Sequence, residues 1–205
     1  MKKEIRSFDF EIRAEQDEQH GTYITGQPIV YNEETDLGWY REEIRDGALD
    51  GADLRDVRFL VNHNTDMIPL ARSRNNNVNS TMQLSVVSGH GMDIRVDLDT
   101  ENNTDAKSLY SAVDRGDISG MSFMFSVRED EWEDLDTDKP KRIITQFDKI
   151  FEVSAVTFPA YEATSIQARG LSDALESAKE SLESAKAEQR EIERRKQRIR
   201  ILTEV

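Results

Sequence analysis

Short runs in which hydrophobic and polar residues alternate recur along much of the chain before residue 158, and they predict a chain rich in β-strands. The clearest runs are residues 8–12, 22–31, 57–61, 94–98 and 143–158. A helical pattern interrupts them after Asn103 or Thr104, either of which can cap a helix, and it ends before Gly116. The acidic stretch at residues 129–141 joins two predicted strands, and its composition predicts a solvated hairpin tip.

The hydrophobic pattern changes at Leu171. From there to Val205, apolar and alanine residues recur at alternating steps of four and three with two polar interruptions, and neither glycine nor proline occurs. This spacing predicts one long helix with a coiled-coil seam, which pairs with its own copy or with a partner's helix. The tail holds 8 basic and 8 acidic residues, so the whole net charge of −14 belongs to residues 1–170. We therefore predict a domain at residues 1–169 followed by a helical tail at residues 170–205.

The composition argues against several functional classes. Because 27 basic residues stand against 41 acidic ones, the chain lacks the basic surface that binds nucleic acid phosphates. The chain has no cysteine, which excludes disulfides and thiolate metal sites, and its three histidines follow no metal-binding spacing. We therefore expect no metal and no cofactor. No apolar run is long enough to cross a bilayer and no signal-peptide core follows the first residues, so the sequence predicts a soluble intracellular protein.

A strand-like run at residues 118–127 carries a hydroxyl group in an unusual position. In an extended chain Met121 and Phe123 share one face, whereas Ser122 points to the other. Gly120 lies two residues earlier, and a glycine within a strand often marks the close approach of another chain. These features fit a nucleophile in a substrate groove, although a half-exposed strand with small polar residues facing water explains the same pattern.

Two further polar residues stand where the strand pattern predicts burial or close approach. Glu152 lies within an apolar run at residues 150–156, where an ionised carboxylate is costly unless it is paired. His63 follows the strand at residues 57–61 and can be that partner. A carboxylate on one imidazole nitrogen fixes the tautomer, and the other nitrogen can then take the proton of a serine hydroxyl. The sequence thus predicts a catalytic triad in which His63 and Glu152 activate Ser122.

Each member of this triad also has a structural explanation. A histidine at the end of a strand is more often structural than catalytic, and an isolated serine is weak evidence for catalysis. The alternatives that stay open are an ion pair of Glu152 with Arg72 or Arg128, and the competing hydroxyl groups of Ser119 and Ser154.

Four blocks of the sequence, read in order, resemble the prohead maturation proteases of tailed bacteriophages, serine peptidases related in fold to herpesvirus assemblin. The blocks are residues 41–48, 57–64, 115–125 and 151–161. Two positions depart from the family pattern. The usual Leu-Gly-Arg triplet after the histidine reads Leu70-Ala71-Arg72, and Met124 stands where the family usually has glycine.

The resemblance implies an α+β fold, mainly an assemblin-like antiparallel β-barrel with peripheral helices, followed by the coiled-coil helix. It implies that Ser122 is the nucleophile, His63 the general base and Glu152 the third member of the triad. The backbone N–H groups of Ala160 and Tyr161 are candidates for stabilising the oxyanion of the tetrahedral intermediate.

The resemblance also implies where the protein acts and on what. The expected enzyme co-assembles inside the immature capsid in the host bacterial cytoplasm, where it cleaves scaffold or the scaffold-like segment of the major capsid protein. It also cuts itself. The expected partners are therefore the major capsid protein, the scaffold segment and further copies of this chain in a homo-oligomer, with no nucleic acid and no membrane.

Two other functional classes fit the sequence less well. A non-catalytic scaffold or assembly module would keep the barrel and use the helical tail to join the shell. An esterase or amidase for small molecules would turn over activated esters but leave the capsid protein uncut.

Overall fold

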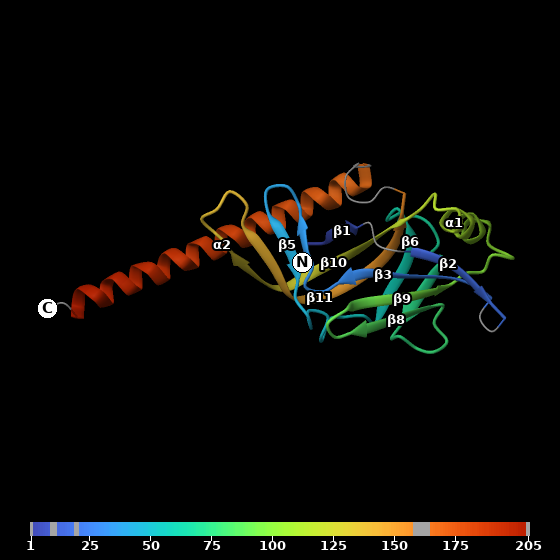
Figure 1. The fold of residues 1–205 in the computed structure, drawn as a ribbon, viewed down its shortest axis with the longest axis horizontal. Helices are drawn as coiled ribbons and strands as arrows, with labels where there is room; N and C mark the ends of the chain where they lie inside the picture. The colour runs from blue at the N-terminus through green and yellow to red at the C-terminus, as the bar shows by residue number, and fades with distance from the viewer. Residues whose placement is uncertain (1, 9–11, 19–20, 158–164, 204–205) are drawn as a thin grey trace.

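A computed structural model of the chain describes residues 2–8, 12–18, 21–157 and 165–203, and strands dominate this part (Figure 1). The described strands form two sheets, and two helices lie beside them. Neither described helix is both long enough and apolar enough to cross a membrane.

The larger sheet has seven described strands and is mixed. Four of its ladders are antiparallel, whereas β11 pairs in parallel with both β5 and β6. Its strands are β1 (Glu4–Phe8), β4 (Glu34–Asp36), β5 (Arg41–Ile44), β6 (Asp56–Val61), β7 (Ala71–Arg74), β10 (Gly120–Glu133) and β11 (Lys141–Val156). β1 lies at the edge of this sheet and pairs with β10.

The long hairpin of β10 and β11 forms the middle of the larger sheet. Its ladder shifts register repeatedly between Met124 and Asp130, and such bulges bend and twist a hairpin. The segment from Gly120 to Met124 pairs with Glu152 to Val156 without a shift. This regular segment carries the residues of the candidate site.

The smaller sheet has four described strands, which pair antiparallel in the order β2-β3-β9-β8. They are β2 (Ile12–Asp17), β3 (Gly21–Val30), β8 (Met82–Val87) and β9 (Gly91–Asp97). The predicted closed barrel is therefore wrong, since no ladder in the described part joins a strand of one sheet to a strand of the other. A barrel needs continuous pairing around its whole circumference, and the short strands β4 and β7 end the larger sheet instead.

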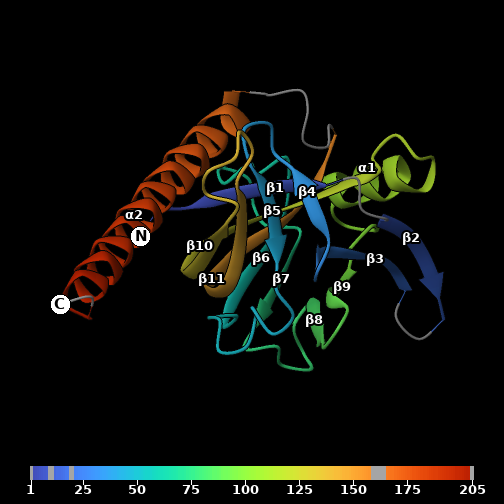
Figure 2. The ribbon, with the colours of Figure 1, turned by 60° about the vertical axis from the view of Figure 1, so that its left-hand side comes forward.

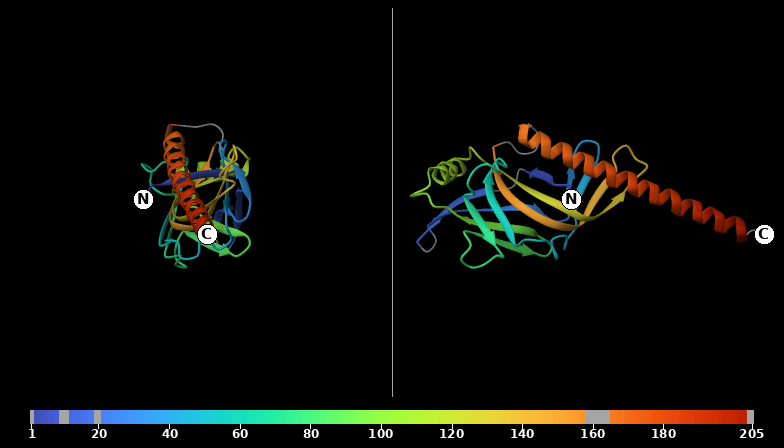
Figure 3. Two further views of the ribbon diagram at one scale, coloured as in Figure 1. Left: turned by 90° about the vertical axis from the view of Figure 1, so that its left-hand side faces the viewer. Right: turned by 180° about the vertical axis from the view of Figure 1, so that it is seen from behind.

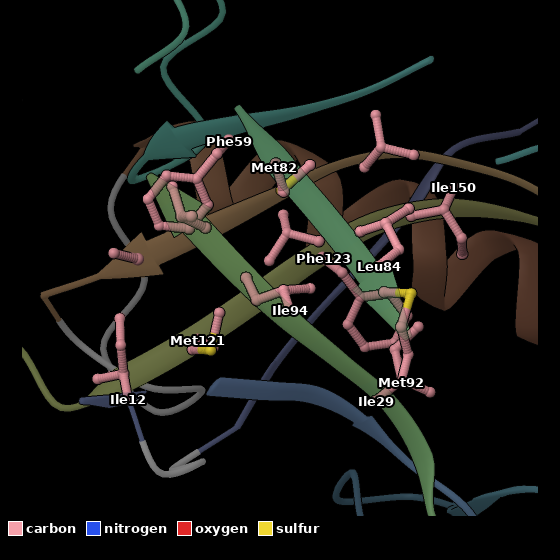
Figure 4. Close-up of a cluster of buried hydrophobic side chains, with 14 of the residues drawn as sticks. Ile12, Ile29, Phe59, Met82, Leu84, Met92, Ile94, Met121, Phe123 and Ile150 are labelled. Carbon is pink, nitrogen blue, oxygen red and sulfur yellow. The ribbon is translucent and has the colours of Figure 1, made fainter. Parts of the chain in front are cut away.

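One hydrophobic core fills the space between the two sheets. Figure 4 shows side chains from both sheets meeting there, with Met121, Phe123 and Ile150 from the hairpin facing Met92 and Ile94 from β9. The rings of Phe123 and Phe125 stack at 4.9 Å, and both contact Phe147 edge-on. As the alternation predicted, Met121, Phe123 and Phe125 of β10 thus belong to the core, which leaves Ser122 on the opposite face.

Helix α1 (Thr104–Asp114) begins as the sequence predicted. Asn103 is its N-cap, because the side-chain oxygen accepts hydrogen bonds from the N–H groups of Asp105 and Ala106. The buried residues Ala106, Leu109 and Val113 face the core, and Gly116 follows the helix with φ of 76°. In Figure 2 the helix lies near β2 and β3, which it contacts.

Helix α2 (Ser165–Thr203) is a single long helix that runs past the sheets (Figures 1 and 3). Its first half packs against β1 and β10 through the buried residues Ala174, Ala178 and Leu182. Beyond residue 190 its described side chains are exposed, including Ile192. Part of the seam thus packs on its own chain, and the pairing of the other half as a coiled coil stays a prediction, as does the proposed boundary at residue 170.

A buried cluster of charged side chains connects β1 with the middle of the sheet. Arg6 Nε donates to Glu42 Oε1 at 2.5 Å, and Arg142 Nη1 donates to Glu4 Oε2 at 2.7 Å. We call the cluster the ion-pair network, and its members are Glu4, Arg6, Tyr40, Glu42, Asp130 and Arg142. Burial raises the pKa of the Glu4 carboxyl, but Arg6, Arg142 and a hydrogen bond with Ser177 together lower it by more, so the pKa lies below its usual value overall.

The ion-pair network corrects the expectation of a solvated acidic hairpin tip at residues 129–141. β10 extends to Glu133 and β11 begins at Lys141, so only residues 134–140 form the turn. Asp130 accepts hydrogen bonds from Arg142 at 2.6 Å and from Ser181 of α2 at 2.6 Å. The acidic stretch thus contributes a carboxylate to the network and helps to hold α2.

Candidate functional site

The turn after β6 places His63 against the middle strand of the sheet. Asn62 and His63 both have positive φ angles, 51° and 55°, in the left-handed region that non-glycine residues seldom occupy. Two consecutive residues of this kind cost free energy and persist only where the surroundings fix them. Left-handed residues of this kind cluster at functional sites, although Asn75 and Asn76 form a second such pair in a turn of this chain.

Hydrogen bonds from both sides fix this turn. The N–H group of Asn62 donates to the carbonyl of Ala155 at 2.9 Å, which extends the ladder between β6 and β11. The Asn62 side chain accepts from the N–H group of Thr157 at 2.9 Å and donates to the Thr157 hydroxyl at 2.9 Å. The end of β11 therefore holds the backbone of His63 in place.

His63 and Glu152 form a buried hydrogen bond. His63 Nδ1 lies 2.5 Å from Glu152 Oε1, and side-chain exposure is 0% for His63 and 3% for Glu152. With the carboxylate ionised, Nδ1 is the donor of this bond, so Nε2 of a neutral imidazole carries a free lone pair. Nε2 is buried and has no hydrogen-bond partner within the described part of the chain.

Ser154 completes this side of the site. Its hydroxyl donates to Glu152 Oε2 at 2.5 Å and accepts from the backbone N–H group of His63 at 3.2 Å. Ser154 is fully buried. One serine therefore contacts both the carboxylate and the backbone of the histidine that the carboxylate holds.

Ser122 lies one strand away from this group. Its partner across the β10–β11 ladder is Ser154, so its side chain shares a face with Ser154 and Glu152. The Ser122 hydroxyl donates to the carbonyl of Arg6 at 2.8 Å and accepts from the hydroxyl of Ser7 at 2.8 Å, both residues of β1. The structure thus brings His63 and Glu152 into contact, but it shows no hydrogen bond between Ser122 and His63.

The structure also decides between several sequence alternatives. Arg72 pairs with Asp56 and Arg128 with Asp148, whereas Glu152 pairs with His63. Ser119 is exposed just before β10. The oxyanion candidates Ala160 and Tyr161 lie outside the described residues and stay a prediction. In the described part of the chain no group of histidine and acidic residues is arranged to hold a metal ion.

A family described as caudovirus prohead serine protease matches residues 8–180 of the chain. The chain belongs to this family. Its members are serine proteases of capsid maturation in tailed bacteriophages, which places this prohead protease among capsid components. Neither a curated protein nor a solved structure matches the chain. Ser122, His63, Glu152 and Ser154 all lie within the matched residues.

Two parts of the site could hardly be predicted from the sequence. Ser154 was expected only as an alternative hydroxyl to Ser122, although its spacing from Glu152 places both side chains on one face of a strand. Nothing in the sequence pattern pairs Ser7 or Arg6 with Ser122, because that contact joins residues separated by more than a hundred positions.

Proposed function

We propose that this prohead protease cleaves peptide bonds with Ser122 as nucleophile and His63 as general base. Glu152 orients the imidazole and stabilises the imidazolium that forms. The observation that carries the proposal is the buried pair of His63 and Glu152. Nε2 of His63 is buried and has no hydrogen-bond partner among the described residues. Strand β11, which carries Glu152, lies between β6 and β10 and pairs with β10 at the fully buried Ser122. A buried nitrogen without a hydrogen-bond partner destabilises the fold, and a role in accepting the serine proton would explain why it is kept.

The chemistry that follows is acyl transfer. His63 Nε2 takes the proton of Ser122 as Oγ forms a bond to the carbonyl carbon of the scissile peptide, and the carbonyl π electrons move to oxygen. Collapse of the tetrahedral intermediate breaks the carbon–nitrogen bond, and the imidazolium gives its proton to the leaving amine. Water then repeats the two steps on the acyl-enzyme and frees Ser122. Glu152 stabilises the positive imidazolium throughout.

The substrates proposed are those of an enzyme enclosed in the immature capsid in the host cytoplasm. They are scaffold or the scaffold-like segment of the major capsid protein, and the protease chain itself. The distal half of α2 extends past the sheets with exposed side chains, which suits contact with another copy or with a capsid component.

Co-expression of the full chain with the major capsid protein of the same phage tests this function. The wild-type chain should shorten the capsid protein, as seen by mass spectrometry, and the Ser122→Ala variant should leave it intact. Ser126→Ala is the matched control, since Ser126 is a buried serine on the same strand that donates to Asp148 at 3.0 Å, and it should cleave as the wild type does.

Other outcomes separate the competing functions. Equal cleavage by the wild type and Ser122→Ala would overturn the assignment of the nucleophile. A capsid protein left intact by both chains, while both enter the shell, would favour an assembly module. Rapid turnover of an activated ester with no cut in the capsid protein would favour a small-molecule esterase.

A further inference from the structure

Ser154 and strand β1 both contact the residues of the proposed triad, and each carries a separate inference. Both inferences rest on the proposed function.

The first concerns Ser154. We propose that Ser154 is a positioning residue for cleavage, which holds Glu152 and the backbone of His63 in the geometry that catalysis needs. Its hydroxyl binds Glu152 Oε2 at 2.5 Å, so that the other carboxylate oxygen is left to face His63 Nδ1. The Ser154 Oγ atom also accepts a hydrogen bond from the backbone N–H group of His63 at 3.2 Å.

The position of Ser154 explains why one hydroxyl can fix both partners. It lies two residues from Glu152 on the same face of β11, so neither side chain can rotate without breaking their bond. It also lies beneath a turn whose histidine has a left-handed backbone. A donor to one carboxylate oxygen and an acceptor for the adjacent N–H group together restrict the imidazole to one orientation.

The Ser154→Ala variant tests this role in the full chain with the capsid protein as substrate. Removing a buried hydrogen bond to a charged group should lower kcat by about 10- to 100-fold. KM should change little, because the Ser154 hydroxyl is already bonded to Glu152 and to the backbone of His63. Ser154→Thr keeps the hydroxyl and should restore most of the rate. Ser126→Ala removes a part-buried hydrogen bond from a buried serine to a carboxylate outside the site and should leave kcat unchanged.

Stability measurements keep this test decisive. Thermal unfolding of Ser154→Ala and Ser126→Ala shows how much of each chain is folded, and kcat is compared per folded molecule. A Ser154→Ala protein that cleaves at the wild-type rate would overturn the positioning role, as would a loss that Ser154→Thr does not reverse. Cleavage by Ser122→Ala, or no cleavage by the wild type, would overturn the proposed function itself, so the two failures can be told apart.

The second inference concerns β1, which covers the proposed nucleophile. Ser122 is fully buried, and its hydroxyl forms hydrogen bonds with two β1 residues, through the carbonyl of Arg6 and the hydroxyl of Ser7. A peptide substrate cannot reach Ser122 while β1 lies there. We infer that β1 is a cover strand, which occupies the place of an extended substrate and must leave β10 before cleavage.

The position of β1 in the sheet suits such an exchange. It is an edge strand of only five residues, and its ladder partner is β10. Once it leaves, β10 presents a free row of N–H and C=O groups beside Ser122, and an extended peptide can add there as a new strand. An extended segment of the substrate would then pair with β10 in the place of β1.

The ion-pair network can divide without leaving an isolated charge. Arg6 binds Glu4 of its own strand at 2.9 Å, and Arg142 of β11 binds Glu42 of β5 at 3.2 Å. If β1 leaves, Glu4 and Arg6 go together into water and regain hydration, while Glu42 and Arg142 keep each other. Release of β1 also exposes little apolar surface to water, because Ile5 is its only buried apolar side chain among the described residues.

Helix α2 is placed to control the exchange. It packs on β1 and β10, and Lys2 beside β1 forms a salt bridge with Glu180 of the helix at 2.7 Å. Trp132 and Asp130 of β10 both bond to Ser181 of α2. A partner that pulls α2 from the sheet would therefore loosen β1 as well, which connects assembly to activity.

A cysteine lock tests the cover strand directly, because the chain has no cysteine of its own. Ile5 and Met124 are direct partners across β1 and β10, within the usual reach of a disulfide. The Ile5→Cys/Met124→Cys protein should cleave the capsid protein when reduced. When oxidised it should cleave at least about tenfold more slowly, because the rate follows the fraction of open molecules.

Two controls make the result specific. The Ser85→Cys/Asp93→Cys pair joins direct partners of β8 and β9 in the other sheet, and its oxidation should not change the rate. The single variants Ile5→Cys and Met124→Cys show whether either substitution alone lowers activity.

A second measurement covers the case in which the reduced double variant does not cleave. A fluorophosphonate reacts with activated serine hydroxyls, and mass spectrometry gives its rate of attachment at Ser122. Oxidation of the lock should slow this attachment at least about tenfold. Equal attachment in the reduced and oxidised protein, or equal cleavage, would overturn the cover strand. Labelling of wild-type Ser122 shows separately that the proposed nucleophile is correct.

Discussion

Two buried clusters of polar side chains lie in the same seven-stranded sheet. They differ in how many of their hydrogen-bond donors and acceptors have partners. In the ion-pair network every carboxylate receives a hydrogen bond from an arginine, and the arginines bind two or more partners each. The second cluster consists of His63, Glu152 and Ser154, and we call it the triad cluster. In it the Nε2 atom of His63 is buried with no hydrogen-bond partner among the described residues. Its histidine also lies in a strained left-handed turn.

This difference separates a structural role from a chemical one. A saturated cluster of charges stabilises one arrangement, and its cost of burial is met by the bonds within it. An incomplete cluster keeps a free lone pair in a buried place, which stability alone does not explain. We therefore expect substitutions in the first cluster to affect folding and substitutions in the second to affect cleavage.

The largest expected effect is that of Glu152→Gln. The amide has nearly the same shape but cannot stabilise the imidazolium, and the loss typical of such a change in a serine protease triad is about 10⁴-fold in rate. Cleavage of the capsid protein measures it, and thermal unfolding should show a folded protein. Unchanged processing would show that Glu152 is structural, and the contrast between the clusters would then disappear.

Arg142→Met should have the opposite profile. It leaves Glu4 and Glu42 short of a cation in a buried place, which costs about 3–5 kcal/mol of unfolding free energy. Urea unfolding measures this cost, and the cleavage rate per folded molecule should not fall. Arg115→Met is the control, because its salt bridge with Asp117 is exposed and should contribute less than about 1 kcal/mol. A loss of similar size in both variants would contradict the structural role of the network.

Much of the fold could be predicted because its cues are local. The N-cap at Asn103, the glycine at the end of α1 and the absence of breakers after Leu171 each determine an element within a few residues. The arrangement of the strands in two open sheets could not be predicted in this way. Pairing of β1 with β10 joins residues more than a hundred positions apart, and neither strand's alternation specifies its neighbour.

The candidate site shows the same limit. Burial of Glu152 in an apolar run predicted that it needs a partner, and the structure places His63 at 2.5 Å. The ion-pair network left no such indication, since Glu4, Glu42 and Arg142 resemble the many surface charges of an acidic chain. Which charges are buried depends on the tertiary fold, and the catalytic roles of the site residues stay predictions.

The network should also show itself at alkaline pH. Burial raises the pKa of Tyr40 to about 12, with Arg6 opposing and Glu42 adding to the shift. The folded state therefore keeps a proton that the unfolded state loses near pH 10, so this contribution to stability is complete below pH 10 and is lost as the pH rises towards 12. Its size is about 2–3 kcal/mol.

Comparison with Tyr40→Phe isolates this contribution. The unfolding free energy of the wild type should fall between pH 10 and 12 relative to that of the variant, which has no phenol at this position. The other tyrosines are common to both proteins and cancel. Parallel pH curves would show that Tyr40 does not keep its proton in the network.

The smallest expected effect tests the strained turn that presents His63. Asn62→Gly removes the bonds to Thr157 but relieves the left-handed backbone, whereas Asn62→Ala removes the bonds and keeps the strain. We expect the alanine variant to be less stable than the glycine variant by about 1 kcal/mol, and to cleave about tenfold more slowly than the wild type because the imidazole is less well placed.

Asn32→Ala is the control, since Asn32 has φ of 58° and its side chain binds the N–H group of Asp46, away from the site. It should lose stability without losing rate per folded molecule, and an equal loss of rate in both alanine variants would show that the turn at His63 has no special part in cleavage.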